Sequence, residues 1–574
     1  MLVTRNEQSV SVEAAAYAIV ATAESISVRL AGEEVAGLRP SSAVDTMIRA
    51  EDGTISGKSD SLTSPLTLSV TEEDGVPALV WSAKSACWEK TEYVLRLYET
   101  HAEYFVRVTG KGDVDTIYYF IGTAPVGSTY EFDTGFMPIP TVTGARQCEF
   151  SAQDSYEEFS YLTVPPLFCY VFDICGIKEK LALALTADPG EHNFTRFDYH
   201  TKSKNSLNRF WFTTDQAGHT HVDGTWKSPS ILIYGTPDRH SALKFYADYY
   251  YETGRAAKKD PAEKKPRFWY GPMACGWIEQ YAQMAASNGT GNQNEWARQS
   301  TYDRFNAELE RRDLHPQILI IDDQWQAHYG TAVEDKEKWP DLRGWIDENR
   351  TKRNRHVMLW FKLWSDDGLP DDCCLIDRDS GARFADPTAP AYRAYLRETM
   401  HRLLSADEGC LNADGLKLDF AFTQPVGRNV TSYDGRYGVE LYLELIRLIY
   451  EYAKEAKPEA VISGSPCHPL FARYIDHARL HDYCPNLRRC YEEFAFRREL
   501  YEIAMPGVLF DTDGAGFSSH RDTMRYLTMA PELGIPDLYC ITDMPSIRLT
   551  DEDWAKVAAV WRAYGERVDA CVKD

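Results

Sequence analysis

The sequence has no long apolar run and comparatively few basic residues. No stretch approaches the roughly eighteen consecutive apolar residues that a membrane-spanning helix requires. The 62 Lys and Arg residues are outnumbered by 86 Asp and Glu residues, which leaves a formal net charge of -24. Because nucleic acids and anionic membranes repel so acidic a surface, we exclude both as partners. We expect a neutral substrate instead.

Paired cysteine spacings are missing as well. The 13 cysteines form no Cys-x-x-Cys motif, and no cluster of histidines completes a zinc site. Scattered cysteines in an odd number are typical of reduced thiols, so we predict no disulfide framework, no metal and no cofactor. The N-terminal residues include Glu7, Glu13 and Glu24 and lack a basic start followed by an apolar stretch, which predicts a cytoplasmic protein.

The first part of the chain has the alternating pattern of β-strands and few helix patterns. Residues 95–98 and 104–108 both alternate along the chain and flank a short turn, as in a hairpin. The length of 574 residues allows two to four domains. We predict an antiparallel β-sandwich domain over residues 1–260. The charged, proline-bracketed residues 254–266 form the predicted linker, and a surface loop within one domain is the alternative.

From residue 261 to residue 574 the pattern changes to strands that alternate with helices. The eight predicted strands are residues 268–275, 317–321, 356–361, 415–420, 460–463, 478–481, 507–510 and 537–541. Eight strands, each followed by a helix, match a (β/α)8 TIM barrel. A doubly wound open sheet is the alternative, but its Gly-x-Gly-x-x-Gly turn follows none of these strands.

Carboxylates follow several of the predicted strands, at the end where a barrel places its functional groups. Lys417 and Asp419 are two residues apart in one strand, so they project from the same face. An ammonium that close would keep the carboxylate ionised for nucleophilic attack, although a structural ion pair at a strand end is the alternative. Glycoside hydrolysis needs two carboxyl groups across a sugar. The carboxylates expected at this mouth are Asp322, Asp323, Asp419, Asp482, Asp511 and Asp513.

Three segments resemble motifs of the α-galactosidase and melibiase clan, glycoside hydrolase families 27 and 36. Residues 321–325, Ile-Asp-Asp-Gln-Trp, resemble its Asp-Asp-Gly-Trp motif, and residues 416–420 resemble the Lys-x-Asp motif of its fourth strand. Residues 479–482, Arg-Leu-His-Asp, resemble the sixth-strand segment that holds the proton donor. The resemblance spans roughly residues 267–574, and the β-rich part before them resembles the N-terminal sandwich of family 36.

The resemblance implies a role for each matching residue. Asp419 would form a covalent glycosyl-enzyme, and Asp482 would protonate the leaving oxygen and then activate water. Asp322 and Asp323 would accept hydrogen bonds from the hydroxyls at C4 and C6, and Lys417 would donate one to a ring hydroxyl. The remaining substrate-binding candidates are Trp325 and Trp364 as pocket walls, together with Arg479 and Asp513.

One segment departs from the family pattern where the sugar 2-substituent is bound. Family 36 has Cys-Ser-Gly-Gly-Gly-Gly-Arg there, whereas residues 463–468 are Ser-Gly-Ser-Pro-Cys-His. We therefore include Cys467 and His468 among the binding candidates and leave galactose, N-acetylgalactosamine and β-L-arabinopyranose open. Cys467 and His468 do not form a nucleophile pair, because adjacent residues of an extended strand point to opposite faces.

The sequence thus predicts a retaining exo-glycosidase that hydrolyses terminal α-galactosides or closely related sugars. Its predicted ligand is a small carbohydrate. The sequence does not decide whether the protein forms a homo-oligomer. Two alternatives remain. A transglycosylase like raffinose synthase would use the same two aspartates with a sugar acceptor in place of water, and a pseudoenzyme would bind sugar without turnover.

Overall fold

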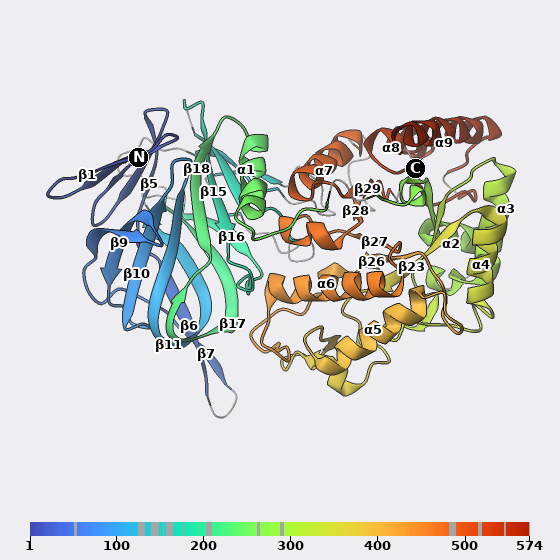
Figure 1. Ribbon diagram of the computed structural model, residues 1–574, viewed down its shortest axis with the longest axis horizontal. Coiled ribbons are helices and arrows are strands. Elements are labelled where there is room, and N and C mark those ends of the chain that lie inside the picture. The colour runs from blue at the N-terminus through green and yellow to red at the C-terminus, as the bar shows by residue number, and fades with distance from the viewer. Residues whose placement is uncertain are drawn as a thin grey trace. The chain divides into compact units, whose positions relative to one another are not determined.

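The computed structural model describes residues 1–50, 54–123, 132–138, 148–152, 154–156, 165–174, 176–202, 209–260, 264–287, 292–480, 490–514, 519–544 and 547–572. By their internal contacts the residues form two compact units. The first contains Met1–Ile139, Arg146–Arg255 and Val426–Tyr442, and the second contains Pro140–Ala145, Ala256–Pro425 and Leu443–Asp574. Figure 1 shows the chain coloured from its N-terminus to its C-terminus. Within the described ranges, no helix is both long and apolar enough to cross a membrane.

The first unit is built from antiparallel sheets, as predicted. Its smaller sheet has the order β1-β2-β3-β4-β5, and its larger sheet contains β6 to β18. The strands are β1 (Leu2–Arg5), β2 (Val10–Glu13), β3 (Ala18–Ala21), β4 (Ile26–Leu30), β5 (Glu33–Leu38), β6 (Ala43–Arg49), β7 (Ile55–Lys58), β8 (Thr67–Glu73), β9 (Val76–Ala83), β10 (Lys90–Leu97), β11 (Ala102–Thr123), β12 (Phe132–Phe136), β13 (Glu149–Ser151), β14 (Cys169–Ile174), β15 (Lys180–Thr186), β16 (Phe197–Lys202), β17 (Arg209–Lys227) and β18 (Ser230–Thr236). The predicted hairpin is the β10–β11 pair, in which Leu97 faces Ala102. The sandwich arrangement of the sheets stays a prediction.

Aromatic side chains fill part of the core of the larger sheet. Tyr170 and Phe172 of β14, Phe197 of β16 and Phe212 of β17 contact one another ring to ring. All four are buried. These four rings therefore contribute to the packing of the sheet. The helix α1 (Arg239–Glu252) follows β18 and buries Leu243, Tyr246 and Tyr250.

The second unit contains a nearly closed parallel barrel. The strand order is β29-β28-β27-β26-β23-β20-β19-β30, and a parallel bridge from Asp511 to Ile535, just ahead of β30, joins the two ends of that row. Its strands are β19 (Met273–Cys275), β20 (Ile318–Ile321), β23 (His356–Lys362), β26 (Gly415–Asp419), β27 (Val461–Gly464), β28 (His477–Arg479), β29 (Leu509–Asp511) and β30 (Asp537–Leu538). The eight predicted strands are therefore confirmed, with shorter bounds for most.

Helices follow most of these strands. They are α2 (Trp277–Ala286), α3 (Gln299–Arg311), α4 (Leu342–Arg353), α5 (Pro390–Leu404), α6 (Gly438–Ala456), α7 (Cys490–Ala504), α8 (His520–Leu533) and α9 (Asp551–Cys571). Short hairpins formed by β21 (Gln326–His328) with β22 (Val333–Glu334), and by β24 (Cys374–Ile376) with β25 (Arg383–Ala385), extend the segments after β20 and β23. The expectation of a helix after every strand is wrong at β27, because only the 3-10 helix η7 (Pro469–Tyr474) separates β27 from β28.

Alternate residues of the barrel strands share one buried interior. Met273 and Cys275 of β19, Ile318 and Ile320 of β20, and Met358 of β23 belong to one apolar cluster. Because strand side chains alternate, the next residues on the same face lie two positions further toward each C-terminus. The polar residues expected at the barrel mouth therefore stand directly above an apolar floor.

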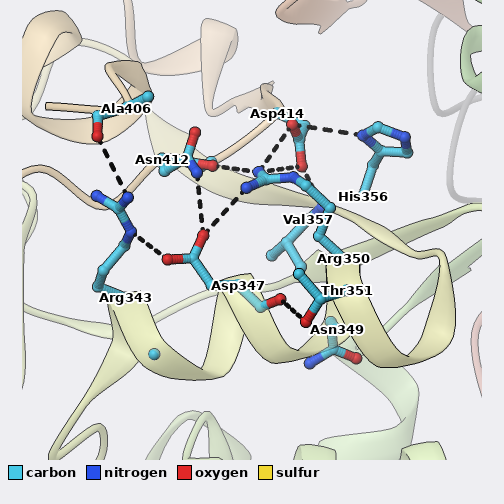
Figure 2. A network of polar contacts seen from close by, with 12 residues as sticks. Arg343, Asp347, Asn349, Arg350, Thr351, His356, Val357, Ala406, Asn412 and Asp414 are labelled. Carbon is cyan, nitrogen blue, oxygen red and sulfur yellow. Dashed lines mark hydrogen bonds and ion pairs between the residues drawn. The ribbon is translucent and has the colours of Figure 1, made fainter.

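A polar network anchors the beginning of β26 (Figure 2). Asp414 precedes the strand and accepts hydrogen bonds from the Val357 backbone N–H at 3.0 Å and from Arg350 at 2.9 Å. Lys457 Nζ lies 3.2 Å and His356 Nδ1 3.4 Å from Asp414 Oδ1. Burial alone would raise the pKa of Asp414, but these cations and donors hold it well below its ordinary value.

Replacing Asp414 with Asn should destabilise the barrel in a pH-dependent way. The amide removes the buried carboxylate that Arg350 and Lys457 share, and Arg350 keeps its pair with Asp347, so we expect a loss of about 3 kcal/mol in the free energy of unfolding near neutral pH. A carboxyl with a lowered pKa contributes stability above its unfolded pKa of about 3.9, and that contribution is lost as the pH falls. Urea unfolding should therefore show the difference from wild type shrinking below about pH 4. An Asp551→Asn control, at an exposed ion pair with Arg312, should change little, and an equal loss at every pH would contradict the electrostatic cause.

Candidate active site

The backbone is strained where the chain leaves several barrel strands. Gln324, Trp364, Phe420 and Asp513 adopt φ angles of 70°, 64°, 61° and 42°, and they follow β20, β23, β26 and β29. A left-handed conformation at a residue other than glycine costs on the order of 1 kcal/mol or more and persists where the surroundings enforce it. Such residues cluster at functional sites, so the C-terminal end of the barrel is the place to look for chemistry.

Lys417 of β26 is the central cation of the barrel interior. Its ammonium donates to Asp322 Oδ2 at 2.9 Å and to the Tyr539 hydroxyl at 3.2 Å, and it lies 3.9 Å from Asp513 Oδ1. Cys275 Sγ is a further neighbour at 3.4 Å. Burial alone would lower the pKa of Lys417, but Asp322 and the other anionic neighbours raise it well above its ordinary value. Lys417 is therefore a permanent buried cation.

Arg479 of β28 is the second cation. Its Nε donates to Asp513 Oδ2 at 2.8 Å, and one terminal nitrogen donates to the Leu418 carbonyl at 2.9 Å. The same nitrogen lies 3.5 Å from Asp419 Oδ1. Opposite charges thus alternate across the barrel, and we call this row the charge chain: Asp322, Lys417, Asp513, Arg479 and Asp419.

Asp419 is the accessible end of the charge chain. Its side chain is 27% exposed, whereas those of Asp322 and Asp513 are 3% and 0% exposed. Trp360 Nε1 donates to Asp419 Oδ2 at 3.0 Å, and the Phe420 backbone N–H donates to Oδ1 at 2.8 Å. The carboxylate is therefore held in one orientation at the mouth of the barrel while part of it remains open to a ligand.

The expected contact between Lys417 and Asp419 is wrong. Residues two apart in a strand share a face, but their Cα atoms are about 6.6 Å apart along it. The long Lys417 side chain crosses the barrel to Asp322 and makes no ion pair with Asp419. Arg479, a sequence candidate for substrate binding, provides the cation next to Asp419 instead.

Asp323 lies beside Asp322 and has a different environment. It accepts hydrogen bonds from the Tyr329 hydroxyl at 2.9 Å and from Asn294 Nδ2 at 3.1 Å. Burial raises the pKa of Asp323 to about 6, and the negative charges of Asp322 and Asp419 add to the effect of burial. Asp323 therefore changes its charge within the physiological pH range.

Asp513 of the charge chain meets two further carboxylates, Asp511 and Asp537. Oxygens of these three residues lie within 4.8 Å of one another, the one such group in the described part of the chain that could hold a metal ion. Burial raises the pKa of Asp511 to about 6 and that of Asp537 well above its ordinary value. The positive charges of Lys417 and Arg479 offset part of the mutual repulsion of this group.

Several sequence candidates are buried. Trp325 is fully buried and donates from its indole to the Trp360 carbonyl at 2.8 Å, and Trp364 is 2% exposed. The role of both rings as pocket walls stays a prediction. Cys467 and His468 are buried too, and His468 Nδ1 accepts from the Leu470 N–H at the start of η7. Asp482, the expected proton donor, is outside the described residues.

An aromatic cluster around Asp419 was missed by the sequence analysis. The rings of Tyr329 and Phe420 each have their centroid 5.7 Å from that of Trp360. Trp360 and Lys362 continue the inward face of β23 from Met358, and this alternation was the signal that could have identified both. Lys362 lies over the rings of Tyr329 and Phe420.

An apolar cavity among the described residues of this unit lies beside the charge chain and not at Asp419. It has a volume of about 270 Å³ and is lined by residues of α2, α8 and α9 and by the segment 538–544. Tyr539 belongs to this lining and also bonds Lys417. Asp419 and Asp323 are absent from the lining, so hydrogen-bonding geometry, and not the cavity, defines the candidate site.

Comparisons with known proteins show where this fold occurs. No protein-family model and no curated protein matches the chain. Among solved structures, the α-N-acetylgalactosaminidase of Bifidobacterium bifidum in complex with GalNAc matches 98% of this chain and 93% of its own, with a TM-score of 0.59 and 12% identity. The cycloalternan-degrading enzyme of Trueperella pyogenes in complex with isomaltose matches 97% of this chain and 82% of its own, with a TM-score of 0.52 and 13% identity.

The cycloalternan-forming enzyme of Listeria monocytogenes, in complex with a pentasaccharide substrate, matches 99% of this chain and 54% of its own, with a TM-score of 0.51 and 14% identity. This chain therefore spans about half the length of that enzyme. At identities this low the likeness shows a shared fold.

Asp323→Asn should stabilise the protein at neutral pH and not at acid pH. Because the folded pKa of Asp323 is about 6 and the unfolded pKa about 3.9, stability is lost as the pH rises between these values. The amide removes that loss, so we expect up to about 2 kcal/mol more stability near pH 7.5 and no gain near pH 4. Urea unfolding at the two pH values measures the effect. A gain of equal size at both values would contradict the titration, and Asp551→Asn is the exposed control.

Proposed function

We propose that the protein is a retaining glycoside hydrolase that removes terminal α-galactosyl or closely related units. The observation that carries the proposal is the presentation of Asp419. Asp419 is the accessible carboxylate of the charge chain, and hydrogen bonds from Trp360 and Phe420, together with the ion pair to Arg479, fix its orientation. A nucleophilic carboxylate needs this combination of access and preorganisation.

In the proposed mechanism Asp419 attacks the anomeric carbon and the bond to the leaving oxygen breaks. Asp482 protonates that oxygen, then removes a proton from the water that releases the sugar from Asp419. Two displacements retain the anomeric configuration, and they require the two carboxyl groups to lie about 5 to 5.5 Å apart. When the carboxylate is released, Asp419 regains its full charge for the ion pair with Arg479 and for the hydrogen bond from Trp360.

The remaining residues of the site would bind the sugar. The donors that hydrogen-bond Asp323 within the described residues, Tyr329 and Asn294, are both neutral, so its carboxylate suits a sugar hydroxyl. Asp322 is already engaged by Lys417 and Cys275, so it would act through the orientation of Lys417 more than by direct contact. A site that pairs a buried carboxylate with one hydroxyl discriminates against the epimer that lacks it, because the carboxylate would lose its partner.

The structural neighbours support sugar hydrolysis on this fold. They include an α-N-acetylgalactosaminidase and a cycloalternan-degrading enzyme, and the latter has also been solved in complex with a covalent intermediate. This supports a covalent route for the present chain. The neighbours act on different sugars, so the choice of galactose rests on the motif resemblance.

Hydrolysis of an aryl α-galactoside should depend on Asp419. We expect Asp419→Ala to lose at least about a thousandfold in kcat/KM, because the nucleophile is gone. Added azide should restore part of the turnover by occupying the space of the missing carboxylate. The matched control Asp551→Asn should keep wild-type rates. A wild-type protein that binds sugar and turns over none of the aryl α-galactoside, α-N-acetylgalactosaminide and β-L-arabinopyranoside would instead support the pseudoenzyme.

Transfer to a sugar acceptor is the alternative reaction. The presence of a cycloalternan-forming enzyme among the structural neighbours is the reason to test for it. Water and an acceptor hydroxyl compete for the same glycosyl-Asp419. If hydrolysis is the main reaction, adding sucrose or galactinol to the aryl α-galactoside should leave free galactose as the chief product. Predominant formation of oligosaccharides, measured by chromatography, would show that transfer is the reaction.

A further inference from the structure

Lys362 is a third cation at the mouth of the barrel. It ends β23, and its position pairs in register with Asp419 at the end of β26. Its ammonium lies 4.3 Å from the centroid of the Tyr329 ring and 4.7 Å from that of the Phe420 ring. The side chain is partly buried, so the ammonium stands at the edge of the aromatic cluster, next to the proposed nucleophile.

The ammonium of Lys362 lacks the anionic partners that the other two cations have. Lys417 is paired with Asp322, and Arg479 with Asp513. Among the described residues, Lys362 has no carboxylate within 4.0 Å and no hydrogen-bond acceptor. Aromatic faces attract the positive charge but offer no lone pair to its three N–H bonds. The two rings therefore position the Lys362 ammonium, and no described residue accepts a hydrogen bond from its N–H groups, so they are available to a ligand.

We propose that Lys362 binds an anionic oxygen group of the glycoside, so that the substrate carries one negative charge on its terminal sugar or on the unit attached to it. The inference rests on the proposed glycosidase function and names its substrate class. A carboxylate, as in a uronic acid, accepts up to two hydrogen bonds from an ammonium, and a charge-assisted hydrogen bond is about twice as strong as a neutral one.

One negative charge fits this site better than two. Asp323 and Asp419 lie near Lys362, and the chain has a net charge of -24. A dianion such as a phosphate monoester would meet more repulsion than a single cation offsets. The net negative charge of the chain repels anions at long range and so favours a neutral ligand. Lys362 can still attract a single negative charge, because it acts at hydrogen-bonding distance.

The test compares substrates that differ only in charge. One pair is an aryl α-galacturonide and the matching galacturonamide, and the other is an α-galactoside whose aglycone carries a carboxylate or a carboxamide. Lys362→Met keeps the length of the side chain and removes its charge. We expect the ratio of kcat/KM for the acid over the amide to fall about tenfold or more in one pair, and that pair locates the charge.

Two further variants make the result specific. Lys362→Arg should retain most of the preference for the acid, because the guanidinium also donates to a carboxylate. Lys556→Met, which changes an exposed lysine of α9 that pairs with Glu552, should leave both ratios unchanged. The proposal would be overturned if Lys362→Met left the acid-to-amide ratio of kcat/KM unchanged in both pairs, as it would if the acid and the amide lost activity equally.

Failure of the glycosidase function is distinguishable from failure of this inference. If no glycoside is hydrolysed, calorimetry with both acid–amide pairs of the test still measures the preference for the charged form. A preference for the acid of one pair that disappears in Lys362→Met would support Lys362 as the anion contact of a binding protein. Equal affinity for the acid and the amide in both pairs, or no binding of any of the four compounds, would overturn it.

Discussion

The charge chain is the constraint on which the barrel depends. A buried ammonium or guanidinium is tolerated only when carboxylates accept its donors, and removing one partner leaves an uncompensated charge. Lys417 and Arg479 come from β26 and β28, while their partners Asp322 and Asp513 follow β20 and β29. Four strands must therefore keep their register for the chain to close. The same requirement fixes Arg479 beside Asp419, so the stability of the barrel and the orientation of the proposed nucleophile have one cause.

The strands could be predicted because their signal is local. Apolar runs such as residues 317–321 and 356–361 need only their own composition to indicate a buried strand, and the structure places β20 and β23 there. The missing α-helix after β27 could not be predicted in this way. Residues 465–476 are rich in proline and apolar side chains, and the 3-10 helix η7 buries Leu470 and Phe471 without a longer helix. The local helix propensity of a segment does not tell whether a short 3-10 helix is enough to cover the barrel between β27 and β28.

The site was predictable in its residue types and not in its pairings. Carboxylates after barrel strands follow from the architecture, so Asp322, Asp419 and Asp513 could be found from the chain alone. Which cation meets which carboxylate depends on distances across the barrel, and there Lys417 reaches Asp322 and leaves Asp419 to Arg479. Motif matching also gave no sign of the structural contact of Trp325, because an aromatic residue within a ligand-binding motif can hold the motif itself. Its indole bonds the carbonyl of Trp360, whose own indole holds Asp419.

A site this acidic destabilises the fold that carries it. Burial raises the pKa of Asp323, Asp511 and Asp537, so their charged forms cost stability that a neutral side chain would not. Lys417 and Arg479 are paired within the charge chain, whereas Lys362 lies against the rings of Tyr329 and Phe420. Among the described residues Lys362 pairs with neither Asp323 nor Asp419, although its charge acts on Asp323. Had stability alone set this arrangement, Lys362 would be expected to bind one of these two carboxylates. Its position on the rings of Tyr329 and Phe420 keeps both the cation and the nucleophile available, which is what a ligand with a negative charge near its reacting carbon would require.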